Sequence, residues 1–332
     1  MADRVLVTGG AGFVGYHLAS ALVERGYRVT LVDDLSRGRV DADLRALLDH
    51  VELVQHDLTE PLPGVALGNG WRYVYHLAAV VGVQRANGQP ARVLRTNLLS
   101  TVNVLDWCAR VTPEAVFLSS TSEIGDGAAR LGLTGYPVPE SAAFALPEPH
   151  APRTSYSVSK LAGELLTMHM AEASGFRARI ARYHNVYGPR MGHSHVIPQF
   201  IDRVLDGVTP FPLYGAHQTR AFCHVRDAVD ATIRLTELPG DEPVLANVGN
   251  DREELPIIDL ARTLFELVGV SPPLEIHDPP AGSPDRRLPD LTRLRALTGY
   301  EPSVPLSEGL ADTYEWYARD RAATRVGAAC AS

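Results

Sequence analysis

The chain has 332 residues, of which 45% are hydrophobic and 21% are charged. This composition is typical of a folded globular protein and excludes a disordered or fibrous chain. The 31 basic and 39 acidic side chains give a net charge of −8, and no block of Lys and Arg stands out. The charge therefore gives no reason to expect a nucleic acid or an anionic membrane as partner. A membrane-spanning segment is not expected either, because no apolar run reaches the roughly 18–20 residues that span a bilayer.

Three cysteines are spread widely along the chain, at Cys108, Cys223 and Cys330, without the spacing of a disulfide framework or a metal site. Residues 1–4 lead directly into an apolar segment and lack the pattern of a secretory signal. Both features predict a cytoplasmic protein. The histidines at 184, 193 and 195 follow no common ligand spacing, so we expect no metal.

The first predicted elements alternate between strand and helix. Residues 4–7 are predicted to form a buried strand because they are short, β-branched and followed by glycines. Apolar residues recur at helical spacing over 13–25, and Gly26 is placed to end that helix. The same reasoning predicts strands at 28–32, 51–54, 73–77, 116–118 and 179–181, and helices at 98–109 and 157–173. This alternation predicts an α/β fold, a Rossmann-type doubly wound parallel sheet covered on both faces.

After about Arg182 the pattern becomes less regular and richer in proline. We expect a first domain over 1–181, to which part of 216–250 returns, and a smaller, loop-rich α/β lobe over 182–320 that binds the substrate. The tail at 321–332 is expected to be disordered.

A glycine-rich loop lies between the first strand and the first helix. Residues 8–15 read TGGAGFVG, which places glycines at Gly9, Gly12 and Gly15 and begins the helix with Phe13 and Val14. Bare backbone N–H groups and the helix dipole favour a pyrophosphate at such a loop. A tight turn without a ligand is the alternative reading of the glycines alone.

An acidic residue closes the second predicted strand. Asp33 follows Gly15 by 18 residues, close to the offset of about 20 at which a carboxylate accepts hydrogen bonds from the adenosine ribose. A carboxylate there repels a 2′-phosphate, so the pattern predicts NAD rather than NADP. The alternative is that Asp33 only begins a turn.

Tyr156 and Lys160 lie four residues apart at the start of a predicted helix, so both project from one face. An ammonium group near a phenol lowers the phenol pKa. Tyr156 is therefore a candidate base for a sugar hydroxyl that loses a hydride to nicotinamide.

These motifs, with the Ser-Ser-Thr segment at 119–121, resemble the extended short-chain dehydrogenase/reductase family of nucleotide-sugar epimerases, dehydratases and decarboxylases. The resemblance covers residues 4–316. It implies cofactor contacts at Gly9, Gly12, Phe13, Val14, Gly15, Asp33, Asp57, Leu58, Leu77, Ala78, Ala79, Asn97, Tyr156 and Lys160. It implies contacts with a nucleotide-sugar substrate, with UDP-sugars favoured, at Asn185, Arg190, His195, Val196, Tyr214, Arg220 and Arg287.

The residues after Ser120 bear on the reaction. Thr121, Ser122 and Glu123 stand where the common 4,6-dehydratases carry Thr-Asp-Glu, and Ser122 lacks the acid that protonates a departing hydroxyl. The triplet resembles that of the UDP-glucuronate decarboxylases, which implies C4 oxidation followed by decarboxylation to UDP-4-keto-pentose or UDP-xylose. Thr121 would then bind the C4 oxygen, and Glu123 would position the ring or manage protonation at C5. The resemblance places Arg220 at the carboxylate or the phosphates and Arg287 at the diphosphate.

Other reactions remain open at this point. GDP-mannose 4,6-dehydratases also carry Thr-Ser-Glu, 4-epimerases share the Tyr/Lys pair, and a nucleotide-binding protein without turnover is a third reading. The chain also lacks the tyrosine that the family usually carries after Glu-Val. The Gly/Pro-rich segment over 124–152 either reshapes the sugar pocket or forms a disordered surface loop.

Two apolar stripes predict a homodimer through a four-helix bundle, as the resemblance implies. The alternative is that both stripes face the protein's own sheet. Their residues are Leu98, Val102, Leu105 and Cys108 on the first helix, and Leu161, Leu165, Met168 and Ala171 on the second.

Overall fold

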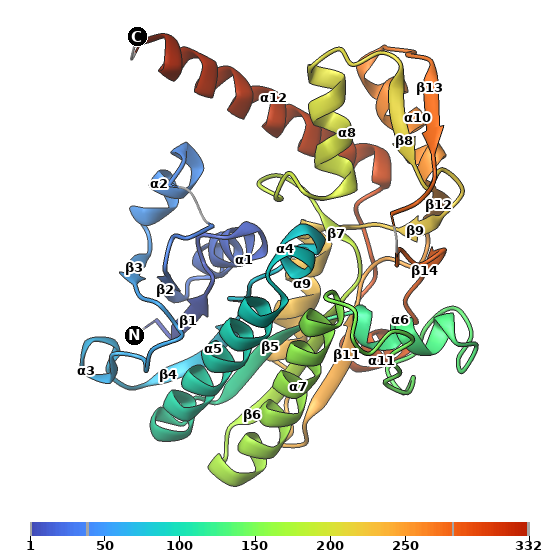
Figure 1. Ribbon diagram of the computed structural model, residues 1–332. Coiled ribbons are helices and arrows are strands. Elements are labelled where there is room, and N and C mark those ends of the chain that lie inside the picture. Colours follow the sequence, from blue (N-terminus) through green and yellow to red (C-terminus); the bar gives the residue numbers. More distant parts are fainter. Residues whose placement is uncertain (1, 38–39, 281, 331–332) are drawn as a thin grey trace.

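The computed structural model describes residues 2–37, 40–280 and 282–330. Its centre is a seven-stranded sheet in the order β11-β6-β5-β4-β1-β2-β3, with every neighbouring pair parallel (Figure 1). The doubly wound α/β fold is thereby confirmed. The strands are β1 (Arg4–Thr8), β2 (Arg28–Asp33), β3 (Glu52–Gln55), β4 (Trp71–His76), β5 (Ala115–Thr121), β6 (Arg177–Tyr183) and β11 (Val244–Val248).

Helices cover both faces of the sheet because successive strand residues point to opposite sides. Val5 and Val7 pack in one core with helices α1, α9 and α11, whereas Leu6 lies in a second core with α5 and α7. Figure 1 shows α5 and α7 side by side across one face. The bounds are α1 (Phe13–Glu24), α5 (Pro90–Val111), α7 (Thr154–Ser174), α9 (Val225–Thr236) and α11 (Thr292–Thr298), and shorter helices are α2 (Ala42–Leu48), α3 (Gly64–Leu67), α4 (Val83–Gly88) and α6 (Glu123–Arg130).

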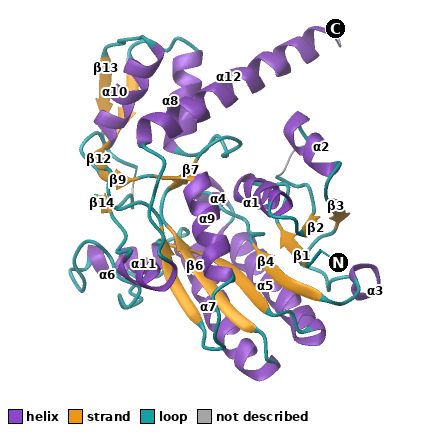
Figure 2. Cartoon of the chain, turned by 180° about the vertical axis from the view of Figure 1, so that it is seen from behind, coloured by secondary structure: helices purple, strands orange, loops and turns teal. Residues whose placement is uncertain are grey.

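A second lobe has its own apolar core, in which Phe200, Phe211 and Phe265 meet edge to face. Figure 2 shows this lobe beside the carboxyl ends of the large sheet. Its helices are α8 (Val196–Leu205), α10 (Ile257–Val268) and α12 (Leu306–Cys330), and its strands are β8 (Phe211–Tyr214), β13 (Leu274–His277), β9 (Thr219–Ala221), β12 (Glu254–Pro256) and β14 (Arg286–Arg287). A short ladder of β7 (Val186–Tyr187) and β10 (Cys223–His224) joins the lobes.

The chain crosses between the lobes more than once. After β6 it builds α8 and β8 in the second lobe, then returns through α9 to β11, which pairs in parallel with β6. The division at 181 and 182 remains a prediction about domains.

Three expectations differ from the structure. Helix α5 begins at Pro90, eight residues before the predicted start, because proline is tolerated in the first turn of a helix. The tail expected to be disordered continues α12 to Cys330, since its alanines have high helix propensity. Of the two apolar stripes, Leu105 and Cys108 on the first and Ala171 on the second face the protein's own core.

The Gly/Pro-rich segment over 124–152 is tied to the rest of the fold. It begins as helix α6, and its Val138 pairs with Pro289 and donates to the Leu288 carbonyl at 2.9 Å. Further along, the Glu140 carbonyl accepts from Arg182 at 3.0 Å. The segment is therefore fixed against both the sheet and the second lobe, unlike a disordered surface loop.

None of the described helices is both long and apolar enough to cross a membrane. Within the same residues, no group of three or more His, Cys, Asp or Glu side chains could hold a metal ion.

Candidate active site

The glycine loop turns sharply between β1 and α1. Gly9 adopts a φ of 70°, and a Cβ there would lie 2.8 Å from the Ala78 nitrogen. A Cβ on Gly15 would lie 2.2 Å from the Gly9 carbonyl oxygen. Only glycine permits this close return of the backbone, which leaves the amino end of α1 uncovered by side chains.

Asp33 lies beside this loop at the end of β2. Its carboxylate accepts from the Ala11 nitrogen at 3.0 Å and from the Leu35 nitrogen at 2.8 Å. Burial raises the pKa of Asp33 above its usual value, and the two backbone hydrogen bonds oppose this shift only in part. The acid is thus fixed at the glycine loop, where a ribose hydroxyl could reach it.

The other predicted cofactor residues lie along the same edge of the sheet. Asn97 on α5 holds the segment after β4 through Val80, accepting from its nitrogen at 2.7 Å and donating to its oxygen at 3.2 Å. Leu77 and Ala78 pack beside the glycine loop through hydrogen bonds from their backbone nitrogens to Thr8. Asp57 is exposed and accepts from Thr59, while its neighbour in the chain, Leu58, is buried.

Tyr156 and Lys160 lie on α7, against the end of β5. The Lys160 ammonium donates to the Ser119 carbonyl at 2.7 Å. Burial lowers the pKa of Lys160 to about 8, and the charge of Glu164 opposes that shift. Burial and then the charge of Glu123 raise the pKa of Tyr156, whereas a hydrogen bond with Thr121 lowers it.

Two residues of the triplet at the end of β5 act on this tyrosine, Thr121 through a hydrogen bond and Glu123 through its charge. Thr121 is buried at the strand end, and its hydroxyl accepts from the Glu123 nitrogen at 3.3 Å. Ser122 is buried, and its backbone nitrogen donates to the Tyr183 carbonyl at 3.1 Å. Glu123 begins α6 and points its carboxylate to the arginines of the site.

Sequence reasoning did not find two charged residues here, Arg153 and Asp126. Arg153 donates to Glu123 at 2.8 Å. Arg287, on β14, donates to Asp126 through two nitrogens, at 2.8 Å through Nε, and its Nη2 lies 3.8 Å from Glu123. The available signal was local spacing, since Asp126 follows Glu123 by three residues on α6 and Arg153 precedes Tyr156 by three.

A buried ion pair lies beneath the catalytic helix. Glu164, one turn after Lys160, accepts from Nε and Nη2 of Arg182 at 2.9 and 2.8 Å and from the Ser120 hydroxyl at 2.5 Å. Arg182 also holds Glu140 of the 124–152 segment. The pair therefore joins β5, β6, α7 and the covering segment at one point.

The guanidinium donors of Arg220 are used within the second lobe. Its guanidinium donates to the carbonyls of Thr219 at 2.7 Å and Pro284 at 2.6 Å, and burial lowers its pKa to about 10. Asn185, with a φ of 43°, donates to the Ala221 carbonyl at 3.0 Å. Both side chains brace the backbone of the second lobe in this structure.

The other four predicted substrate residues are Arg190, His195, Val196 and Tyr214. Arg190 donates to the Ala11 carbonyl at 3.2 Å, beside the glycine loop, and stacks over Tyr16. His195 caps α8, where Val196 begins, and burial lowers its pKa. Tyr214 is 46% exposed and stacks on His277 with ring centroids 4.8 Å apart.

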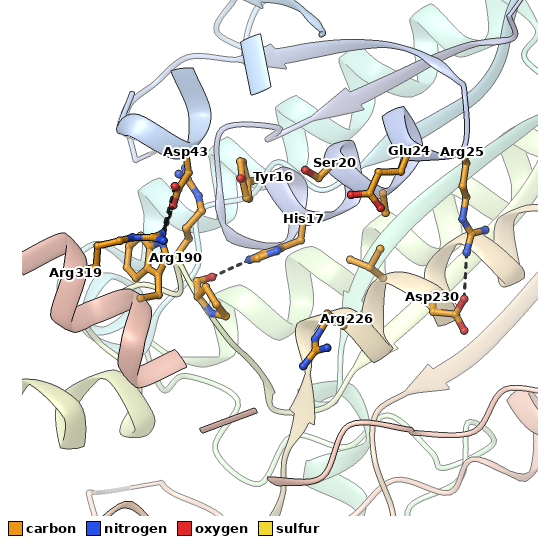
Figure 3. A pocket seen from close by; sticks show the side chains of 14 residues that line it. Tyr16, His17, Ser20, Glu24, Arg25, Asp43, Arg190, Arg226, Asp230 and Arg319 are labelled. Atoms are coloured by element: carbon orange, nitrogen blue, oxygen red, sulfur yellow. Dashed lines mark hydrogen bonds and ion pairs between the residues drawn. The ribbon is translucent and has the colours of Figure 1, made fainter. Parts of the chain in front are cut away.

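A cavity of about 550 Å³ lies on the outer side of α1, between the lobes (Figure 3). Its lining includes His17, Arg226 and Arg319, and, of the predicted substrate residues, Arg190. Tyr156, Lys160 and Glu123 do not line it. The chemistry expected of the Tyr/Lys pair therefore belongs to the cluster at the carboxyl end of β5, outside the lining of this cavity.

The residues present fit an NAD cofactor. The glycine loop provides a cradle that a side chain at Gly9 or Gly15 would fill, and Asp33 presents a carboxylate beside it. Both features match the demands of a dinucleotide with an unphosphorylated ribose.

Comparisons with known proteins agree with this geometry. Residues 5–249 match the model of the NAD dependent epimerase/dehydratase family. A UDP-glucuronic acid decarboxylase 1 from Xenopus tropicalis is 34% identical over 323 residues, which cover 96% of this chain and 72% of that protein. A UDP-glucuronic acid decarboxylase 5 from Arabidopsis thaliana is 34% identical over 313 residues, covering 92% of this chain and 87% of the relative.

Solved structures of the same architecture are also similar. A UDP-glucose 4-epimerase with UDP-glucose from Thermotoga maritima has a TM-score of 0.84 at 29% identity, covering 96% of this chain and 99% of that one. A UDP-glucuronic acid 4-epimerase from Bacillus cereus, in complex with UDP-glucuronic acid and NAD, has a TM-score of 0.83 at 26% identity. The match covers 95% of this chain and 99% of that one.

The fold and the site thus define an enzyme with a dinucleotide-binding domain. The chain belongs to the NAD dependent epimerase/dehydratase family. The resemblance stated from the motifs is confirmed, and so is NAD as the cofactor of the family.

Proposed function

We propose that this protein oxidises C4 of UDP-glucuronate with NAD and decarboxylates the product to UDP-4-keto-pentose or UDP-xylose. The observation that carries the proposal is the identity of about 34% over 92–96% of the chain to curated UDP-glucuronic acid decarboxylases. Ser122 supports it against the common 4,6-dehydratases, which carry an aspartate at that place to protonate the departing hydroxyl.

The site residues divide the work. Tyr156 takes the proton of the C4 hydroxyl, with the ammonium of Lys160 favouring the phenolate, while bound NAD supplies the hydride acceptor. Thr121 holds the C4 oxygen. The C5–C6 bond then breaks and carbon dioxide leaves, while the electron pair of that bond moves toward the C4 oxygen and an enolate forms. C5 finally takes up a proton, and Glu123 controls this protonation.

The binding assignments from the sequence are part of the proposal. The cofactor residues are those given above, from Gly9 to Lys160. For the substrate, Asn185, His195, Val196, Tyr214, Arg220 and Arg287 are proposed to bind the nucleotide sugar. The contact of Arg190 with the glycine loop supports a role on the cofactor side for this residue.

The direct test is to incubate the protein and NAD with a panel of UDP-, dTDP-, GDP- and CDP-sugars and to follow product masses. We expect loss of carbon dioxide from UDP-glucuronate. Loss of water would identify a dehydratase, and no change of mass with an inverted C4 would identify an epimerase. Either result with UDP-glucuronate would contradict decarboxylation.

A 4-epimerase is the second candidate, favoured by the structural likeness to 4-epimerases at TM-scores of 0.83–0.84. It would use the same Tyr/Lys pair and return the hydride to the other face of C4. The carboxylate of UDP-glucuronate would then be retained.

We also infer a homodimer and a cytoplasmic location. Val102 is 36% exposed and Leu165 is 50% exposed on α5 and α7, which supports a contact between two copies. Cys108 and Cys223 are buried free thiols, which supports a reducing compartment. Fractionation of the source cells tests the location, and recovery with the membrane or exported fraction would contradict it.

A further inference from the structure

The site contains two arginines that already carry carboxylate partners. Arg153 pairs with Glu123 at 2.8 Å, and Arg287 pairs with Asp126 through Nε at 2.8 Å. The side chains of Arg287 and Asp126 are 15% and 13% exposed, so solvent screens this pair only weakly.

Lys160 is in a different state. Its ammonium donates to the Ser119 carbonyl and, at 3.4 Å, to the Ser119 hydroxyl. Among the described residues no carboxylate lies within ion-pair distance of it, although the charge of Glu164 acts from one turn away. Within the described part of the chain, Lys160 at the Tyr156 end therefore has no carboxylate partner, whereas Arg153 and Arg287 at the Glu123 end each have one. Arg220, which feels the charges of Arg287 and Asp126, is held instead by the carbonyls of Thr219 and Pro284.

This arrangement of charges favours the movement of negative charge from the sugar carboxylate to the C4 oxygen. When a 4-keto acid loses carbon dioxide, the negative charge of the carboxylate leaves through the breaking C5–C6 bond and arrives on the C4 oxygen. A cation at the carboxylate stabilises the reactant and slows the step, whereas a cation near the C4 oxygen stabilises the transition state. The pairing of Arg287 therefore matters for the rate as well as for the fold.

We propose that Asp126 is a positioning residue that neutralises Arg287, so that the sugar carboxylate is bound weakly enough to be expelled. The inference rests on the proposed decarboxylation. Arg287 lies within 3.8 Å of Glu123, and both charges act on Tyr156. This guanidinium therefore borders the reacting sugar, and not only the diphosphate at which the resemblance places it. Asp126 follows Glu123 by three residues, in the segment that lacks the tyrosine the family usually carries after Glu-Val.

The first experiment measures binding without turnover. In a Tyr156→Phe background with NAD present, calorimetry compares UDP-glucuronate with UDP-glucose. We expect Asp126→Asn to bind UDP-glucuronate at least about tenfold more tightly, because Arg287 is released to a charge-assisted hydrogen bond. UDP-glucose should change by less than about twofold. The ratio of the two affinities within one variant also corrects for any partly unfolded fraction.

The second experiment measures turnover with Tyr156 restored. For Asp126→Asn we expect a lower KM for UDP-glucuronate, a lower kcat for carbon dioxide release, and accumulation of reduced nicotinamide, visible near ~340 nm. Asp126→Glu keeps the charge and should return both constants toward the original values.

Glu254→Gln is the matched control. Glu254 holds Arg286, the neighbour of Arg287 on β14, by two hydrogen bonds of 2.7 and 2.8 Å outside the cluster around Tyr156. It should leave the affinity ratio and kcat unchanged. An unchanged affinity ratio in Asp126→Asn, faster carbon dioxide release by it, or an equal change in Glu254→Gln would each overturn the inference. Absence of carbon dioxide release by the unaltered protein would overturn the proposed function instead, while the affinity ratio would still decide on Asp126.

Discussion

At the scale of single residues, the site depends on how burial sets the charge of a few groups. Tyr156 and Lys160 share one face of α7, where burial raises the pKa of the phenol and lowers the pKa of the ammonium. Burial therefore disfavours the charged form of each group. Transfer of the phenol proton to the amine of Lys160 therefore costs more here than it would between groups with ordinary pKa values.

Tyr156→Phe removes the proposed base while keeping the ring. We expect nicotinamide reduction and carbon dioxide release to fall together by about 10²–10⁴-fold. Stopped-flow absorbance and gas release measure the two steps. Tyr27→Phe, which removes a hydroxyl bonded to Glu237 on an exposed surface, should leave both rates unchanged. Loss of only one of the two rates in Tyr156→Phe would argue against a common base.

The pH dependence follows from the pKa of Lys160, which burial lowers from 10.5 to about 8. Above about pH 8 the ammonium loses its proton and no longer favours the Tyr156 phenolate, so activity should fall. Stability should respond in the opposite sense, because between about 8 and 10.5 the unfolded chain binds more protons at this lysine. Loss of the Lys160 proton therefore stabilises the fold while it lowers activity, so the alkaline fall in activity does not come from unfolding caused by this lysine. A pH profile of kcat with parallel urea unfolding measures both, and a profile unchanged in Lys160→Met would exclude this group.

Asp33→Ala removes the carboxylate that would repel a 2′-phosphate. We expect the preference for NAD over NADP to narrow, chiefly through weaker binding of NAD. Calorimetry with each dinucleotide gives the affinities. Asp34→Ala is the control, since that neighbouring carboxylate is exposed and accepts only from the Ser36 nitrogen among the described contacts. Equal affinities of the unaltered protein for NAD and NADP would contradict the role of Asp33.

At the scale of elements, the buried pair of Glu164 and Arg182 ties α7 to β6. Removal of one partner leaves a buried charge uncompensated, so Glu164→Leu should lower the free energy of unfolding by about 3–5 kcal/mol. Replacing both residues by leucine should cost less than the single change, because no charge is left buried. Urea unfolding monitored by circular dichroism measures both variants. A double variant less stable than the single one would show that the pair itself stabilises the fold.

At the scale of the whole molecule, two copies are expected to associate through the outer faces of α5 and α7. Leu165→Glu and Val102→Glu place charges on exposed apolar positions of α7 and α5 and should convert a dimer to a monomer. Light scattering at micromolar concentration reports the mass. Leu267→Glu, at a 42% exposed leucine on α10, should leave it unchanged. A monomeric mass for the unaltered protein would remove the dimer.

Much of the sheet could be predicted from the sequence, but less of the site could. Strands such as β1 and β2 were predictable because their residues are apolar, β-branched and bounded by glycine or aspartate. Asp126 and Arg287 lie 161 positions apart, and their pairing depends on β14 lying over α6, which no local pattern encodes. The early start of α5 was missed because its first turns contain polar residues at positions that only tertiary contacts decide.

The pairing of β11 with β6 also bears on synthesis. A ribosome completes β6 at Tyr183 but delivers the strand that covers it only at Val248. At about 5–20 residues per second, the ~65 residues between these points take about 3–13 seconds. Throughout that time the nascent sheet presents the edge of β6, with Ile180 and Ala181, as a template for other chains. A gene fragment that stops near residue 181 would make this exposure permanent, so such a fragment should aggregate where the whole chain stays in solution.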